Sequence, residues 1–310
     1  MGSSLSTPRL PTLDALVRRR RSPYSVAVST TALGLVMAAA LIHAGWNALA
    51  KRAGDPLAFL WCAGGVGTLL YLPGVLYVLR ETGFPWAALP FVVATVILHS
   101  AYFFTLGRAY RSGDLSLIYP VARGLGVALV PILAFLIFDE RLSPVGALGV
   151  ALVVLGILSL QRRERWSPAR LLAPGTGWAL ATGLIIAAYS LVDKAGVARL
   201  HPLPYVGLME AGACLVLMPA LLSRRNALRH EWRADWRTIV VAGVMSPGGY
   251  LLVLFAFQFS KTGYVVAGRE VSIVLSALIG SLWMGEGAVG RRLAGAAVVA
   301  AGVLCVALAR

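Results

Sequence analysis

Long apolar segments separated by short polar connectors run from about residue 27 to the end of the chain. Most are close to the roughly 20 residues that an α-helix needs to cross a bilayer. A helix satisfies its own backbone hydrogen bonds, so it is the form that such segments take in lipid. The pattern predicts ten transmembrane helices, at about 27–50, 57–79, 88–110, 116–137, 143–160, 176–196, 204–222, 237–259, 263–284 and 289–309.

Two charged pairs recur at a fixed offset along the chain. Arg123 and Glu140 lie 17 residues apart, and Arg269 and Glu286 repeat this spacing 146 residues later (269 − 123 and 286 − 140). A second match joins WNALAK to YSLVDK, which begin at residues 46 and 189. The chain is therefore interpreted as two copies of one unit.

Each copy would contain five helices, and this odd number determines the relation between the copies. The second copy must enter the membrane in the opposite sense to the first, which is a recurring design of transporters. The predicted fold class is an all-α membrane protein, with ten transmembrane helices arranged as two inverted five-helix repeats. The predicted regions are a disordered basic tail (1–24), a first repeat (25–160), a basic connector (161–175) and a second repeat (176–310).

Composition supports a membrane protein and excludes the soluble class. Of 310 residues, 58% are hydrophobic and only 13% are charged, whereas charged residues make up about a quarter of a soluble domain. The net charge of +15 comes from the tail and short connectors rather than from one basic face with aromatic residues. Such charge is typical of membrane topology and membrane surfaces, so no nucleic-acid partner is expected.

Several motifs in both copies carry a family resemblance. They are HAGWNALAKRAG (43–54), SLIYPVARG (116–124), FDERLS (138–143), YSLVDKAGV (189–197), GREVS (268–272) and MGE (284–286). Together they resemble the EamA-type branch of the drug/metabolite transporter superfamily, over about residues 27–309. The resemblance implies ten helices in two inverted halves, a central cavity, cytoplasmic termini and a multi-pass location in the cell membrane.

Arg123 and Arg269 are the first candidates for binding a substrate. A charged side chain inside a span costs about 2.5–3.5 kcal/mol on insertion scales, so each one requires a reason. We expect both guanidinium groups to line the cavity and to attract a carboxylate or phosphate. In the alternative, each arginine pairs structurally with an acid such as Glu210 or Glu270.

Three further ionisable residues are candidates for coupling to protons or other ions: Glu210, Glu270 and His43. Glu210 lies in the middle of an apolar span, where it would serve either as a coupling carboxylate or as a buried partner of Arg269 or Lys194. His43 and His99 are either hydrogen-bonded packing residues or proton relays. Neither histidine has a Cys or carboxylate at ligand spacing, so no metal site is expected.

Aromatic and polar side chains in the copied segments predict the walls of a small-molecule pocket. The alternative is an interfacial aromatic belt. The predicted substrate-binding residues are Arg123, Arg269, Trp46, Asn47, Tyr102, Tyr189, Tyr250 and Ser272. Glycines at 149 and 156, and at 295 and 302, are expected to let the fifth and tenth helices pack closely.

The sequence contains no Walker loop, no GxSxG and no paired-histidine zinc motif, so neither an enzyme nor a cofactor is predicted. The predicted function is a secondary active transporter of a small polar metabolite, anionic or zwitterionic, such as an amino acid or organic acid. It would work by alternating access around a midplane cavity. The alternative is a membrane-embedded enzyme or flippase acting on a lipid-linked substrate. The expected partners are the substrate, the bilayer and a coupling ion, and a homodimer is left open.

Overall fold

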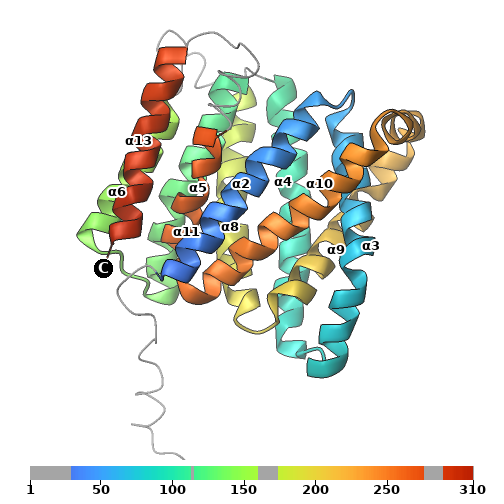
Figure 1. Cartoon of the computed structure of the whole chain (residues 1–310), viewed down its shortest axis with the longest axis horizontal. Helices are drawn as coiled ribbons and strands as arrows, with labels where there is room; N and C mark the ends of the chain where they lie inside the picture. Colours follow the sequence, from blue (N-terminus) through green and yellow to red (C-terminus); the bar gives the residue numbers. More distant parts are fainter. Residues whose placement is uncertain (1–28, 113–114, 160–173, 276–288, 310) are drawn as a thin grey trace, which may run out of the picture.

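A computed structural model describes residues 29–112, 115–159, 174–275 and 289–309 (Figure 1). The tail at 1–24, the connector up to residue 173 and Glu286 lie outside these ranges. Within them the chain forms α-helices: α2 (Thr30–Arg52), α3 (Pro56–Thr82), α4 (Leu89–Ser112), α5 (Leu115–Phe138), α6 (Pro144–Ser159), α8 (Pro174–Val197), α9 (Pro202–Leu222), α10 (Arg225–Phe259), α11 (Thr262–Arg269) and α13 (Val289–Leu308). A short 3₁₀ helix, η1 (Trp86–Ala88), precedes α4.

Seven of these helices are long and apolar enough to cross a membrane, namely α2, α3, α4, α5, α8, α9 and α10. The residues Pro144–Ser159 and Leu293–Leu308 form two shorter apolar helices. The all-helical, multi-pass prediction is therefore confirmed for the described part of the chain. Most of the described helices follow the predicted segments, with differences in α10 and in the ninth segment.

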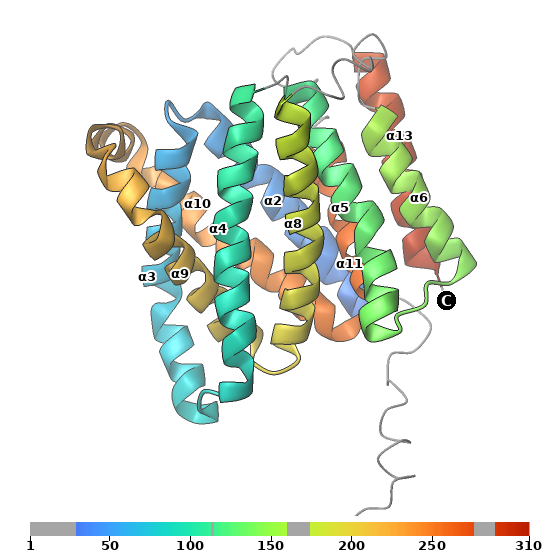
Figure 2. The same ribbon diagram turned by 180° about the vertical axis from the view of Figure 1, so that it is seen from behind.

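The helices stand in a slab with the α6–α13 pair at one end and α3 with α9 at the other (Figures 1 and 2). The helix α10 packs against α2 and α3, while α8 packs against α4 and α5. Large apolar side chains face outward, with Leu69 69%, Ile97 59% and Leu136 69% exposed. Such surfaces suit lipid, and they leave the charged side chains to the interior.

The glycines of α6 and α13 allow these helices to pack with their backbones close together. A Cβ atom on Gly149 would lie 2.7 Å from the carbonyl oxygen of Gly302, and one on Gly302 would lie 2.7 Å from the carbonyl oxygen of Gly149. A Cβ on Gly156 would lie 3.1 Å from the carbonyl oxygen of Gly295. The predicted close packing of the fifth and tenth helices is thus confirmed, and it occurs within one chain.

The helix α10 begins about a dozen residues before the predicted span. Its first part is a basic arm, 225–234, which meets the spanning part at a kink where Asp235 has φ −144° and ψ 33°. Buried Glu231 holds the arm, because its Oε1 accepts a hydrogen bond of 2.7 Å from the backbone N–H of Asp55. Arg224, just before the arm, also pairs with the Asp55 carboxylate.

The ninth predicted segment is interrupted. Its first helix, α11, ends at Arg269, Glu270 forms a turn, and helical structure resumes at 271–275. At the break the backbone N–H of Glu270 bonds to the carbonyl of Ala267, and that of Ile273 bonds to the carbonyl of Glu270. These three-residue closures replace the four-residue closures of an α-helix. The break lies at the charged residues that the sequence singled out.

Candidate functional site

Buried charged side chains collect where α4, α5, α8 and α11 approach one another. The described ones are His99 on α4, Arg123 on α5, Asp193 and Lys194 on α8, and Arg269 and Glu270 at the break after α11. Buried ionisable groups are retained when they are paired or when they serve a ligand. The contacts of each one therefore separate structural charges from a candidate binding charge.

Arg123 is paired with Glu270. Its Nη2 lies 2.5 Å from Oε1 of Glu270, and its Nε donates to Oε2 at 3.2 Å. Both side chains are almost fully buried, at 5% and 1% exposure. This bidentate ion pair connects α5 to the break after α11. It favours the structural alternative for Arg123 over the predicted role in lining the cavity.

Arg269 has no such partner among the described residues. Its Nη2 donates to the hydroxyl of Tyr189 at 3.3 Å, while its buried Nε makes no hydrogen bond. Its guanidinium carbon lies 5.9 Å from the ring centroid of Tyr250. Glu270, although adjacent in the chain, gives both of its oxygens to Arg123.

The repeat offset explains this difference between the two arginines. Subtracting 146 from 270 gives 124, and residue 124 is Gly124. The position that the offset aligns with Glu270 is therefore a glycine, which provides no carboxylate to pair with Arg269. Among the described residues Arg269 is thus left without a carboxylate in direct contact, and a bound anion would supply one.

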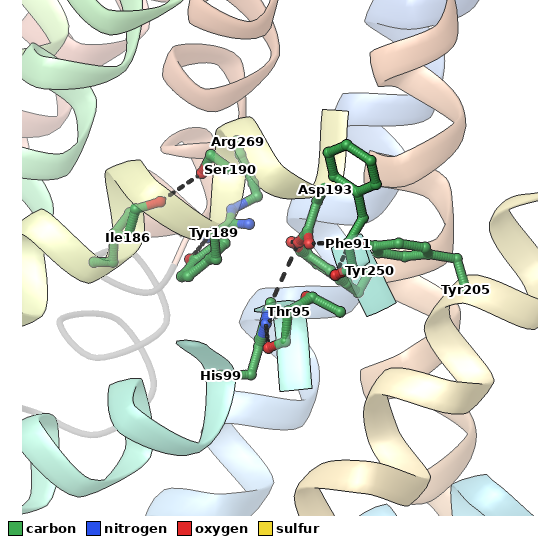
Figure 3. Close-up of polar contacts among 10 residues, drawn as sticks. All are labelled: Phe91, Thr95, His99, Ile186, Tyr189, Ser190, Asp193, Tyr205, Tyr250 and Arg269. Atoms are coloured by element: carbon green, nitrogen blue, oxygen red, sulfur yellow. Dashed lines mark hydrogen bonds and ion pairs between the residues drawn. The ribbon is translucent and has the colours of Figure 1, made fainter. Parts of the chain in front are cut away.

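A second buried cluster surrounds Asp193 (Figure 3). One carboxylate oxygen accepts a hydrogen bond of 2.8 Å from the hydroxyl of Tyr205, and the other accepts one from Tyr250. Nε2 of His99 lies 4.0 Å from the second oxygen. On its other side, Nδ1 of His99 is 3.0 Å from the backbone carbonyl oxygen of Thr95.

Aromatic rings join the Arg269 site to the Asp193 cluster. The centroids of His99 and Tyr189 are 4.4 Å apart, and those of Tyr102 and Tyr189 are 6.0 Å apart. Tyr250 contacts both Arg269 and Asp193. Tyr189 and Tyr250 therefore lie beside Arg269, and Tyr102 lies next to Tyr189, while their role in binding a substrate stays a prediction. The hydroxyl of Ser272, three residues after Arg269, is also buried and without a hydrogen-bond partner.

The other predicted binding residues lie on α2. The ring of Trp46 packs against a small core that includes Phe59 and Ile239. The side-chain amide of Asn47 donates to the carbonyl oxygen of His43 at 2.8 Å, so its own helix uses this donor. The His43 ring meets the edge of Trp46 at 4.9 Å and lies within electrostatic range of both Arg123 and Arg269.

Glu210 lies apart from the two clusters. It sits on α9 against α3, where a Cβ atom on Gly64 would be 3.4 Å from its Oε2. Among the described residues no ion pair joins Glu210 to Arg269 or Lys194, and its role in coupling stays a prediction. Lys194 instead donates to the carbonyl oxygens of Phe257 and Ser260.

Glu140 has a clear structural partner in the first turn of α11. Its Oε2 accepts a hydrogen bond of 2.6 Å from the N–H of Thr262, and its Oε1 lies 3.6 Å from Nζ of Lys194. A carboxylate here complements the positive end of the helix dipole. Glu140 thus fastens the loop after α5 to both α8 and α11.

Tyr205 and Thr95 were not predicted, and Asp193 was predicted only as part of a copied segment. A signal for Asp193 existed, because an acid within an apolar span is costly. Tyr205 carries no such signal, since a tyrosine near a helix end is typical of the membrane interface. A hollow of about 700 Å³ lies elsewhere, along the apolar side chains of α5 and α6, and it does not include the buried clusters.

Comparison with known proteins agrees with the motifs. Residues 173–308 match the EamA-like transporter family, and residues 81–153 match the Small Multidrug Resistance protein family. These matches confirm the resemblance drawn from the sequence. A crystal structure of a protein with no stated function superposes over 91% of this chain and 99% of its own, with a TM-score of 0.71 and 20% identity, which shows a shared fold.

Three curated relatives match parts of the chain. A multidrug transporter of Pseudomonas aeruginosa is 33% identical over 57 residues, which are 18% of this chain and 52% of the relative. An uncharacterised membrane protein of Bacillus subtilis is 34% identical over 65 residues, 21% of this chain and 53% of the relative. A nicotine metabolites export pump subunit of Paenarthrobacter nicotinovorans is 35% identical over 68 residues, which are 22% of this chain and 59% of the relative. The chain thus spans about half the length of these relatives, and none of the three names describes an enzyme.

Proposed function

We propose that this chain, whose second half belongs to the EamA-like transporter family, is a secondary active transporter of a small anionic or zwitterionic metabolite in the cell membrane. An amino acid or an organic acid is the substrate class that fits best. The two halves would rock around a site between them as inverted repeats, as in other transporters built this way. A gradient of substrate or ion would power the cycle.

The observation that carries this proposal is the guanidinium of Arg269, which contacts no carboxylate among the described residues. It is buried, and within the described part of the chain its Nε has no hydrogen-bond partner while its Nη2 donates to a tyrosine hydroxyl. A carboxylate is the natural partner, because its two oxygens match the planar fork of arginine. The unpartnered hydroxyl of Ser272 offers a further donor close by in the chain.

The pair formed by Arg123 and Glu270 supports this assignment. By holding the Glu270 carboxylate, Arg123 prevents it from neutralising Arg269. The pair also stabilises the interruption after α11. Discontinuous helices at which charged substrate groups are bound are a feature of transporter sites.

The surroundings of Arg269 suit a small molecule rather than a lipid chain. Tyr102, Tyr189 and Tyr250 supply apolar faces with hydroxyl groups, which is the usual composition of a metabolite pocket. An enzyme or flippase acting on a lipid-linked substrate would need acid and base groups at one interface. The buried charges around Arg269 lie instead between several helices, and the names of two of the relatives support transport.

Counterflow into liposomes tests the proposed function. Purified protein is reconstituted in vesicles preloaded with unlabelled L-glutamate, succinate or choline, and uptake of the same labelled compound is followed. We expect counterflow of at least one of the anionic compounds and none of choline. Arg269→Gln should reduce it by roughly tenfold or more, because a charge-assisted hydrogen bond contributes about 1.5–3 kcal/mol.

Two controls decide the interpretation. Arg80→Gln changes an exposed arginine at the end of α3 and should leave counterflow unchanged. Equal counterflow by wild type and a folded Arg269→Gln variant would contradict the proposed site. Turnover of a labelled lipid by the wild type, without any counterflow, would instead favour the enzyme or flippase.

A further inference from the structure

The hydrogen bonding of His99 determines where its ring can accept a proton. Its Nδ1 is 3.0 Å from the backbone carbonyl oxygen of Thr95 and 3.1 Å from the Thr95 hydroxyl. A carbonyl oxygen can only accept, so Nδ1 carries the hydrogen. The neutral ring therefore presents the bare lone pair of Nε2 to the interior.

That lone pair faces a carboxylate. Nε2 of His99 lies 4.0 Å from Oδ2 of Asp193, with an acceptor on each side of the gap. A proton added at Nε2 converts two facing acceptors into a charge-assisted donor and acceptor. The hydroxyls of Tyr205 and Tyr250 hold the Asp193 carboxylate in this position.

We propose that Nε2 of His99, facing Asp193, is the proton-binding site that couples transport to a proton gradient. This inference rests on the proposed function, because the proton is taken up together with the anion held by Arg269. The proton comes from an acid in solution on the side to which the site is open. As the N–H bond forms at the Nε2 lone pair, the bond between that acid and the proton breaks and the conjugate base stays in solution; on the other side Nε2 releases the proton to a base in solution, together with the substrate.

The charges of the two clusters explain why proton and anion bind together. Arg269 and Asp193 carry opposite charges and balance each other through Tyr250, which contacts both. An anion at Arg269 adds one negative charge to this buried group, and a proton on His99 removes it. The His99 ring lies against Tyr189, whose hydroxyl accepts from Arg269, so the two sites are one residue apart.

The titratable and charged groups around His99 come from every helix that packs near it. They are Tyr189 and Asp193 on α8, Tyr205 on α9, which bonds to Asp193, Tyr250 on α10 and Arg269 at the end of α11. Arg123 is held by Glu270, and Lys194, next to Asp193, bonds to carbonyl oxygens and Glu140. Asp193 is the one carboxylate among the described residues within ion-pair distance of His99.

The sign of the pH effect follows from this charge count. Protonated His99 attracts the anion, and by linkage the bound anion attracts the proton. Anion binding by the wild type should therefore tighten as pH falls from about 8 towards about 5.5, a range in which most carboxylate ligands stay ionised. His99→Gln should remove this dependence.

Proton movement with L-glutamate or succinate tests the inference in liposomes that contain a pH-sensitive dye. Wild type should acidify the lumen as the labelled anion enters, with about one proton per anion for one histidine. His99→Gln should lose the dye signal, and any counterflow that it retains, which requires no net proton movement, shows that the loss lies in coupling. The exposed His230 on the α10 arm provides the control, since His230→Gln should keep both.

The outcomes separate the two proposals. No counterflow by the wild type overturns the proposed function, whereas counterflow with a dye signal that survives His99→Gln overturns the proton site. Loss of the signal in Glu210→Gln alone would transfer coupling to Glu210. If His99→Gln also abolishes counterflow, the dye assay is repeated with Asp193→Asn. In that variant the side-chain amide oxygen still accepts a hydrogen bond from one of the tyrosine hydroxyls.

A titration that needs no substrate completes the test. Protons bound by the detergent-solubilised wild type between about pH 8 and about pH 4.5 are counted and compared with those bound by His99→Gln. The variant should bind about one proton fewer, as expected for one histidine. Equal proton counts would overturn the inference whatever the transport assays show.

Discussion

At the scale of single residues, the two arginines that the 146-residue offset aligns have different surroundings. Arg123 is neutralised by Glu270, while Arg269 faces tyrosines and has an unbonded Nε. The difference arises from one position, because the first copy has Gly124 where the second has Glu270. Structural and functional charge are thus separable by mutation.

The stability of the fold should depend on Arg123 and not on Arg269. Arg123→Gln leaves the buried Glu270 carboxylate without its partner, which should cost about 3–5 kcal/mol of unfolding free energy. Arg269→Gln removes a charge that has no acid partner, so stability should stay equal or rise. Thermal denaturation of the purified variants in detergent measures both effects.

A double variant controls this comparison. Arg123→Gln combined with Glu270→Gln replaces the ion pair by two amides of similar shape and should recover most of the lost stability. The prediction fails if Arg269→Gln is the more destabilising of the two single variants. It fails equally if the double variant is no more stable than Arg123→Gln alone.

The sequence identified Arg123 and Arg269 but not which of them is paired. Both sit in apolar spans, and insertion cost alone treats them equally. The pairing depends on where the helix break turns the Glu270 side chain, a property of tertiary structure. The same reason explains the Asp193 cluster, whose members His99, Tyr205 and Tyr250 lie on three different helices.

At the scale of secondary-structure elements, Glu140 joins three helices. It follows Asp139, whose φ of 53° turns the chain after α5, and it caps α11 at Thr262 while facing Lys194. Glu140→Ala should lower the unfolding free energy by about 3 kcal/mol or more, because it leaves Lys194 buried without its acid. Asp139→Ala, at an exposed pair with Arg141, should change it by less than about 1 kcal/mol. Comparable melting temperatures for the two variants would refute the role of Glu140.

The α6–α13 contact should tolerate no side chain at its glycines. Gly149→Ala places a Cβ atom against the carbonyl oxygen of Gly302, and overpacking of this kind costs about 1–3 kcal/mol. Gly34→Ala is the matched control, since a Cβ there meets nothing within 4 Å. In detergent, Gly149→Ala should therefore have a lower melting temperature than Gly34→Ala. Equal melting temperatures would show that α6 and α13 can move apart without cost.

The sequence predicted the spanning helices well and the start of α10 poorly. Lipid requires long apolar helices, so hydropathy reports them directly. The arm at 225–234 is rich in arginine and carries a buried Glu231, so it resembles a polar connector in a hydropathy profile. Its helical form depends on the hydrogen bond from Asp55 to Glu231, which links residues 176 positions apart.

At the scale of the whole molecule, large apolar side chains lie on the outside of the described helices, and several charged side chains are buried between them. Leu69 and Leu136 face outward while Arg269, Asp193 and His99 are buried. This distribution is what a bilayer imposes, and it made the fold class predictable from composition. The pairing of the buried charges was not predictable in the same way. Which of them forms an ion pair depends on contacts between helices that are distant in the sequence.

Ligand-induced stabilisation tests the central claim, that Arg269 binds an anion, most directly. Wild type, Arg269→Gln and the Arg123→Gln, Glu270→Gln pair are melted with L-glutamate, succinate or choline at increasing concentration. A ligand at about one hundred times its dissociation constant stabilises the folded state by about 2.7 kcal/mol, which is a clear shift in melting temperature. We predict such a shift with an anionic ligand for wild type and the double variant, and none for Arg269→Gln. An undiminished shift in folded Arg269→Gln, or a shift with choline alone, would contradict the account.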